Sequence, residues 1–146
     1  MKPALLFDPI LWLVLSLASS SDAAELKVHV GHVESDRGLV CVAAHRTESG
    51  YLEQDDNKAF RLAKVQAHKP EVTVSMSDMP PGKYALEVFH DENGDGKLNR
   101  NFLGAPVEPY GISNNVRARY SLPSFADALI AVENTGTEIH IDLARH

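Results

Sequence analysis

The residues with the clearest chemical potential lie in one acidic segment. Asp91, Asn93 and Asp95 supply oxygen donors at alternate positions, and Gly96 follows where such a loop must turn sharply. This is the spacing with which an EF-hand calcium loop begins. Carboxylate, amide and carbonyl oxygens are the ligands that Ca²⁺ prefers in proteins. The segment therefore predicts a calcium site.

The second half of the EF-hand pattern is missing. Phe102 stands where the twelfth position requires a bidentate Glu, and no flanking helices are indicated. Other oxygen donors would have to complete the site, so the expected affinity is weak, with a dissociation constant of about 10⁻⁴–10⁻³ M. The predicted metal ligands are Asp91, Asn93, Asp95, Lys97 through its carbonyl, Asn99 and Glu108.

The alternative is a plain turn, because Asn93-Gly94 and Asp95-Gly96 are both strong hairpin-turn pairs. His90, directly before them, could act as a general base beside the carboxylates. We favour a histidine that bonds loop backbone instead, since the chain has no nucleophile motif such as Gly-x-Ser-x-Gly. Together with His90, the residues predicted to organise the loop or bind a ligand are Asn101, Tyr110, Ser113, Asn114 and Asn115.

These residues belong to a long segment, 90–118, that shows no strand pattern. Ordered loops beyond about 12–15 residues are uncommon in compact domains and are usually functional. Five apolar residues are expected to anchor this segment to the domain: Phe102, Leu103, Val107, Tyr110 and Ile112.

The rest of the chain alternates apolar and polar residues, which is typical of strands. We expect an all-β fold, an antiparallel β-sandwich of about seven strands with Greek-key-like connections, and a β-barrel as the alternative. Segment 39–44 suits a central strand, 62–67 a strand or short helix, and the last two segments a hairpin. The expected strands are 26–30, 39–44, 62–67, 72–76, 83–90, 128–132 and 139–143.

Residues 1–23 resemble a secretory signal peptide, with Lys2, an apolar run and small residues at the end. The run is shorter than the roughly 20 residues of a membrane span. We therefore expect one domain, 24–146, in the periplasm or secreted, with no membrane span after signal removal.

The composition and net charge of the chain limit the classes of partner that it could bind. The chain has 146 residues, 44 % of them hydrophobic and 23 % charged, and a formal net charge of −6. The negative charge argues against nucleic acid as the main partner. The single cysteine, Cys41, lies in an apolar run and is expected to be buried.

Several short segments, in the acidic loop, the strand before it and the region after it, together form a distinctive pattern. They are Pro81-Gly82-Lys83-Tyr84-Ala85, His90-Asp91-Glu92-Asn93-Gly94-Asp95-Gly96-Lys97-Leu98, Asn101, Gly104-Ala105-Pro106, Glu108, Tyr110-Gly111, Ser113-Asn114-Asn115, Pro123-Ser124-Phe125 and Asp127-Ala128. With these segments the chain resembles an uncharacterised bacterial family, domain of unknown function 2141. The resemblance implies an exported β-sandwich and no established catalytic residues. Asn99 departs from the family, whose members often carry Asp there.

Three functions remain open. The first is a non-enzymatic module that binds calcium or an envelope or extracellular ligand with the 90–115 loop, because long anchored loops commonly carry function. The second is a cell-envelope hydrolase that uses His90 with a nearby carboxylate. The third is a protein–protein interaction domain, which would present an exposed apolar patch.

Overall fold

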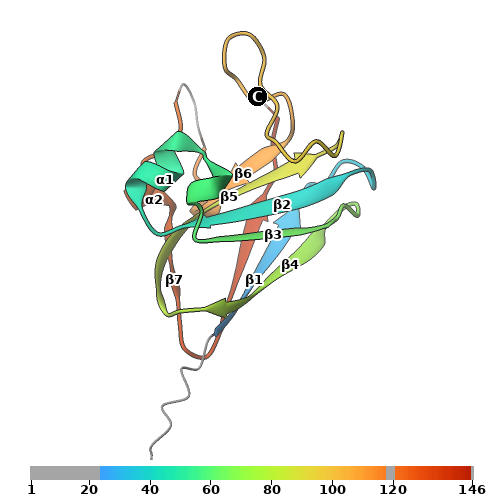
Figure 1. Cartoon of the computed structure of the whole chain (residues 1–146). Coiled ribbons are helices and arrows are strands. Elements are labelled where there is room, and N and C mark those ends of the chain that lie inside the picture. Colours follow the sequence, from blue (N-terminus) through green and yellow to red (C-terminus); the bar gives the residue numbers. More distant parts are fainter. Residues whose placement is uncertain (1–23, 118–120, 146) are drawn as a thin grey trace, which may run out of the picture.

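The computed structural model describes residues 24–117 and 121–145 and shows an all-β sandwich (Figure 1). A three-stranded sheet has the order β4-β1-β8, and a five-stranded sheet has the order β3-β2-β5-β6 with β7 also paired to β5. The predicted fold class is confirmed. The strands are β1 (Ala24–Gly31), β2 (Leu39–His45), β3 (Arg61–Gln66), β4 (Val72–Met79), β5 (Gly82–Asp91), β6 (Tyr110–Ile112), β7 (Leu129–Val132) and β8 (Thr137–Asp142).

Alternation along the strands builds the core between the sheets. Leu26, Val28 and Val30 of β1 point inward and meet Leu86 and Val88 of β5 in one buried cluster. Successive strand side chains point to opposite faces, so the polar residues between them face outward.

The outer face of the larger sheet is also partly covered, by helices α1 (Glu48–Glu53) and α2 (Phe125–Ala128). Tyr51 of α1 and Ala128 of α2 pack with Ala85 and Ile112 in a second cluster. Such cover explains the continuous apolar run of β2, whose residues are nearly all buried, including Cys41. Burial raises the pKa of the Cys41 thiol to about 12, so this thiol stays protonated at neutral pH.

The short elements outside the strands are small. Besides α1 and α2, the described part of the chain has two 3₁₀ turns, η1 (Asp56–Lys58) and η2 (Ser113–Asn115). Segment 62–67 is a strand rather than a helix, since β3 pairs with β2 along its length. Within the described residues, no helix has the length and apolar character needed to cross a membrane.

The expected closing hairpin is wrong. β7 pairs with β5 in the larger sheet, whereas β8 pairs with β1 in the smaller one, and that pairing is parallel. The turn at 133–136 therefore carries the chain from one sheet to the other. A turn sequence fixes local geometry, but the burial of each strand's apolar face decides its partner.

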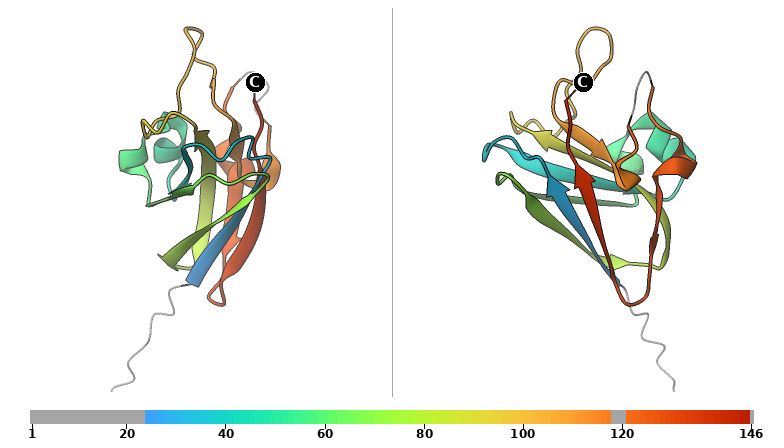
Figure 2. Two further views of the ribbon diagram at one scale, coloured as in Figure 1. Left: turned by 90° about the vertical axis from the view of Figure 1, so that its right-hand side faces the viewer. Right: turned by 180° about the vertical axis from the view of Figure 1, so that it is seen from behind.

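The description of 90–118 as free of strand is also wrong. β5 continues through Asp91, and Tyr110–Ile112 forms β6 against β5. A three-residue strand is too short to show a period of two, which is why the pattern missed it. Between these strands the chain passes through the acidic turn and then a hairpin that projects beyond the ends of the sheets (Figure 2).

Candidate functional site

Asp91 organises the acidic turn. Its Oδ1 accepts the backbone N–H groups of Gly94, at 2.8 Å, and Asp95, at 3.1 Å, and its Oδ2 accepts that of Gly96 at 2.7 Å. Gly94 and Gly96 have positive φ angles of 74° and 78°, which glycine adopts without strain. Because Asp91 is fully buried at the end of β5, these bonds fix the turn to the sheet.

Asp95 is the centre of a second set of hydrogen bonds. Asn99 Nδ2 donates to Asp95 Oδ2 at 2.8 Å, and the Lys97 amide donates to Oδ1 at 2.9 Å. Asn93 Nδ2 donates to Asn99 Oδ1 at 3.0 Å. The bond from Asn99, followed by that from Lys97, lowers the pKa of the Asp95 carboxyl. Asp95 is therefore held as a carboxylate.

Glu108 adds a third negative charge beside these two. Its side chain is 5 % exposed, and Oε2 accepts the Asn99 amide at 3.0 Å. Burial raises the pKa of Glu108, and the charges of Asp91 and Asp95 raise it further. Among residues 24–117 and 121–145 Glu108 has no ion-pair partner.

The predicted metal ligands thus meet in one network, although not as a preformed cation cage. Lys97 enters through its amide, which donates to Asp95. In the described part of the chain, no three His, Cys, Asp or Glu side chains are placed to share a metal ion. A cation here would take most of its oxygens from Asn93, Asn99, the backbone and water.

His90 lies on the inner side of β5 and is fully buried. Its Nε2 is 2.7 Å from the carbonyl oxygen of Arg37, and its buried Nδ1 has no hydrogen-bond partner among the residues that the structure describes. His90 ties the loop before β2 to β5. Because its ring is buried, His90 does not have the exposure that a general base needs to reach a substrate.

The hairpin after the acidic turn corrects the expected anchors. Asn101 braces it, because its Oδ1 accepts the amides of Leu103, at 2.9 Å, and Ala105, at 3.1 Å. Phe102 is 94 % exposed and Leu103 77 % exposed, and Val107 is also exposed, so none of these three is an anchor. Of the five expected anchors, Ile112 is buried and Tyr110 is half-buried. Bonds within the hairpin, rather than apolar packing, order it.

The Ser113-Asn114-Asn115 cluster bonds three neighbouring elements. Ser113 Oγ accepts the Leu86 amide at 2.9 Å and donates to the Ala128 carbonyl. Asn114 Nδ2 donates to two carbonyls, those of Asp127 and Leu129, at 2.9 and 3.0 Å, and Asn115 Oδ1 accepts the Asp142 amide at 2.8 Å. The cluster joins β5, the α2–β7 region and β8.

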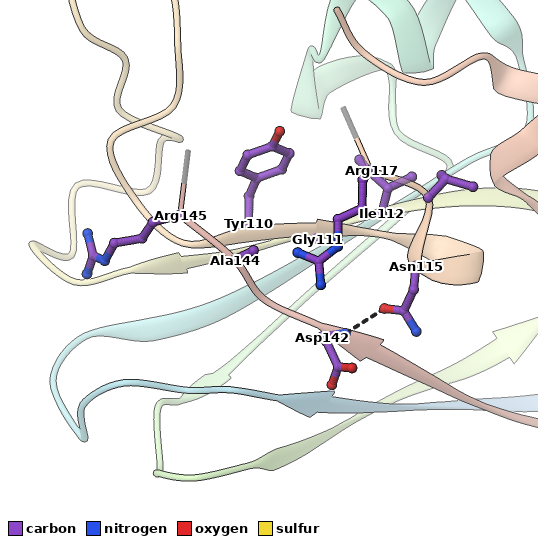
Figure 3. Close-up of a pocket in the computed structure, with 9 residues that line it drawn as sticks. Tyr110, Gly111, Ile112, Asn115, Arg117, Asp142, Ala144 and Arg145 are labelled. Atoms are coloured by element: carbon purple, nitrogen blue, oxygen red, sulfur yellow. Dashed lines mark hydrogen bonds between the residues drawn. The ribbon is translucent and has the colours of Figure 1, made fainter. Parts of the chain in front are cut away.

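Tyr110 and Asn115 also line a pocket of about 220 Å³ between β6 and the end of β8 (Figure 3). Asn115 points toward Asp142, and Arg145 points out of the pocket to bind Glu34 at 2.7 Å and Glu92 at 3.0 Å. Backbone hydrogen bonds between Tyr110 and Ala144, at 2.9 and 3.0 Å, hold the last described residues against β6.

A further polar group was missed by the sequence reasoning. Glu87 of β5 contacts Gln54 and the buried His45 on the outer face of the larger sheet. In the sequence, a single acidic residue between Leu86 and Val88 is typical of a solvent-exposed strand position. Its apolar cross-strand neighbours, Ala43 and Ile112, would have marked Glu87 as unusual. Those neighbours are known only once the register of β5 with β2 and β6 is known.

No curated protein and no solved structure matches the chain. The model of one protein family, described as an uncharacterized protein conserved in bacteria (DUF2141), matches residues 28–140, which include most of both sheets and the whole acidic segment. The chain therefore belongs to the family of domain of unknown function 2141, as its resemblance to that family predicts.

Proposed function

We propose that this protein is an exported binding module that holds calcium weakly at residues 91–108. The supporting observation is Glu108, a buried carboxylate beside Asp91 and Asp95 with no cationic partner in the described residues. Like charges gathered in a partly buried place repel one another. A divalent cation removes that repulsion and supplies the missing positive charge.

The ligand set is oxygen-rich but needs a local adjustment. Asp95 and Glu108 supply carboxylates, and Asp91 keeps lone pairs that its backbone bonds do not use. Asn93 and Asn99 now donate through their amide nitrogens, so each would turn its oxygen toward the ion. Such rearrangement, with water completing about six to eight oxygens, accounts for weak binding.

Calorimetry and thermal melting of the metal-stripped protein test the calcium proposal. With a dissociation constant of about 1 mM, 10 mM calcium adds about 1.4 kcal/mol to the free energy of unfolding. Glu108→Gln should abolish most of this gain. The control Asp56→Asn removes one negative charge from η1 and should leave the calcium-dependent gain in stability unchanged. An equal gain with magnesium at matched ionic strength, or no gain with calcium, would show the proposal to be wrong.

Export is the second part of the proposal, supported by the signal-like pattern of residues 1–23. Fractionation of the native host, followed by mass determination, tests it. A periplasmic or secreted chain that starts near Ala24 is expected. A full-length chain confined to the cytoplasm would overturn the assignment.

A second candidate function is protein interaction through the projecting hairpin. Phe102 and Leu103 stand exposed on a turn that Asn101 holds rigid. Rigid, exposed apolar side chains suit a contact with a partner's pocket. A photo-crosslinking residue at position 102 should give an adduct in cells, whereas the same residue at the exposed turn position 134 should not. Equal labelling at both positions would refute this role.

The hydrolase alternative has no comparable support, because His90 is buried.

A further inference from the structure

A cleft of about 460 Å³ lies on the outer face of the larger sheet and borders the calcium segment at residues 96–100. Its walls are the segment 53–57 on one side and 96–100 on the other. The volume falls in the range of about 300–1,000 Å³ that is typical of small-molecule sites. Ala43, Glu87 and Ile112 are cross-strand neighbours in its floor.

Apolar and aromatic side chains surround the acid in this floor. Phe89 and Tyr110 form the next cross-strand pair along β5 and β6, and both line the cleft. Phe89 is nearly buried, and Ile112 belongs to the second apolar cluster. An apolar platform with one central carboxylate is suited to a ligand that has an apolar body and one positive charge.

Glu87 is fixed from two sides. Gln54 Nε2 donates to its Oε1 at 3.1 Å, and His45 Nε2 lies 3.4 Å from its Oε2. The Glu87 side chain is only 13 % exposed, and that of His45 is 1 % exposed. Neither nitrogen of His45 makes a hydrogen bond within residues 24–117 and 121–145, although Nε2 is within ion-pair distance of Glu87. Burying a carboxylate with so few donors is costly unless a further partner binds it.

The charges of the two walls balance, so Glu87 in the floor gives the cleft its net negative charge. Asp55 and Asp56 line one wall, and Lys97 and Arg100 line the other. Arg100 is engaged by uncharged acceptors, the Gln54 side chain and the Gly104 carbonyl. The remaining acid of the lining, Glu53, is already paired with Lys58 outside the cleft.

We propose that this cleft binds a small organic cation, with its ammonium group at Glu87 and its apolar body against Phe89 and Tyr110. The carboxylate supplies a charge-assisted hydrogen bond, and the two aromatic rings favour a neighbouring positive charge. The site shares no ligand residue with the calcium segment except Lys97, whose side chain takes no part in calcium binding. In calcium-free buffer its test is therefore independent of the calcium test.

Nuclear magnetic resonance with phenethylammonium as the probe tests the proposal, and phenylacetate serves as the matched anion. Saturable shifts are expected at the amides of Ala43, Glu87 and Phe89 with the cation. Glu87→Gln keeps a hydrogen-bond acceptor for Gln54 and should lower the affinity for the cation at least about tenfold. Glu133→Gln, an equal charge change in the exposed 133–136 turn, should leave the affinity unchanged.

Lys97→Gln keeps the experiment decisive if Glu87→Gln fails to fold. Lys97 is exposed, so its replacement should preserve the fold and strengthen cation binding about twofold by removing a like charge. Tighter binding of phenylacetate than of phenethylammonium would overturn the proposal in favour of an anion site. No shift in the cleft at 10 mM of either probe would also overturn it.

Discussion

The replacement Asp91→Ala measures how strongly one side chain orders the acidic turn. It removes three hydrogen bonds from backbone amides, those of Gly94, Asp95 and Gly96. Bonds to a charged acceptor contribute about 1.5–3 kcal/mol each when the donor stays dry. Gly94 and Asp95 are exposed, so water can hydrogen-bond their amides in the variant and offset part of the lost stability. We expect a decrease of about 3 kcal/mol in the free energy of unfolding, and roughly half of that for Asp91→Asn.

Urea unfolding in calcium-free buffer gives this decrease directly, and hydrogen exchange reports whether the amides of residues 94–96 become unprotected. Asp56→Ala also removes an aspartate but breaks no side-chain hydrogen bond in the described residues, and should change stability by less than about 0.5 kcal/mol. A loss below about 1 kcal/mol for Asp91→Ala, with unchanged exchange at 94–96, would refute the assignment of Asp91 as the organiser of the turn.

Three further outcomes are expected. Burial and negative neighbours raise the pKa of Glu108, so folding favours its protonated form, and this contribution is lost as the pH rises through the folded pKa. Glu108→Gln should therefore be more stable than the wild type at pH 7 without calcium, and urea unfolding should show the difference vanish below about pH 4. Ser113→Ala leaves the buried Leu86 amide without its 2.9 Å acceptor and should lose about 1–3 kcal/mol in the same assay. Phe102→Ser with Leu103→Ser should change the melting stability by less than about 0.5 kcal/mol, because both side chains are already exposed.

The strands were predictable where burial is periodic. Leu26, Val28 and Val30 alternate because one side of β1 faces the core and the other faces water. β6 was not predictable from the sequence, because a strand of three residues is too short for the apolar–polar alternation to repeat. The partner of β8 was not predictable either, since pairing with β1 joins residues at opposite ends of the domain.

The acidic turn was predictable for a local reason. Asp91 binds amides three to five residues ahead, and spacing in the sequence is enough to reveal that. The exposure of Phe102 was not, because apolar residues usually pack against the domain and here backbone bonds hold the hairpin instead. The contact of His45 with Glu87 requires the register of β2 on β5, which no local pattern contains.

The parallel pairing of β1 with β8 has a consequence for the order of assembly. Leu26 pairs with Thr137, about 110 residues away, so the two strands meet only after a very long loop closes. β1 is the middle strand of its sheet, between β4 and β8. Until β8 arrives, one side of β1 presents unpaired N–H and C=O groups that could recruit a strand from another molecule. The seam between the first and last strands is thus both a slow kinetic step and the place where an incomplete chain is most exposed to aggregation.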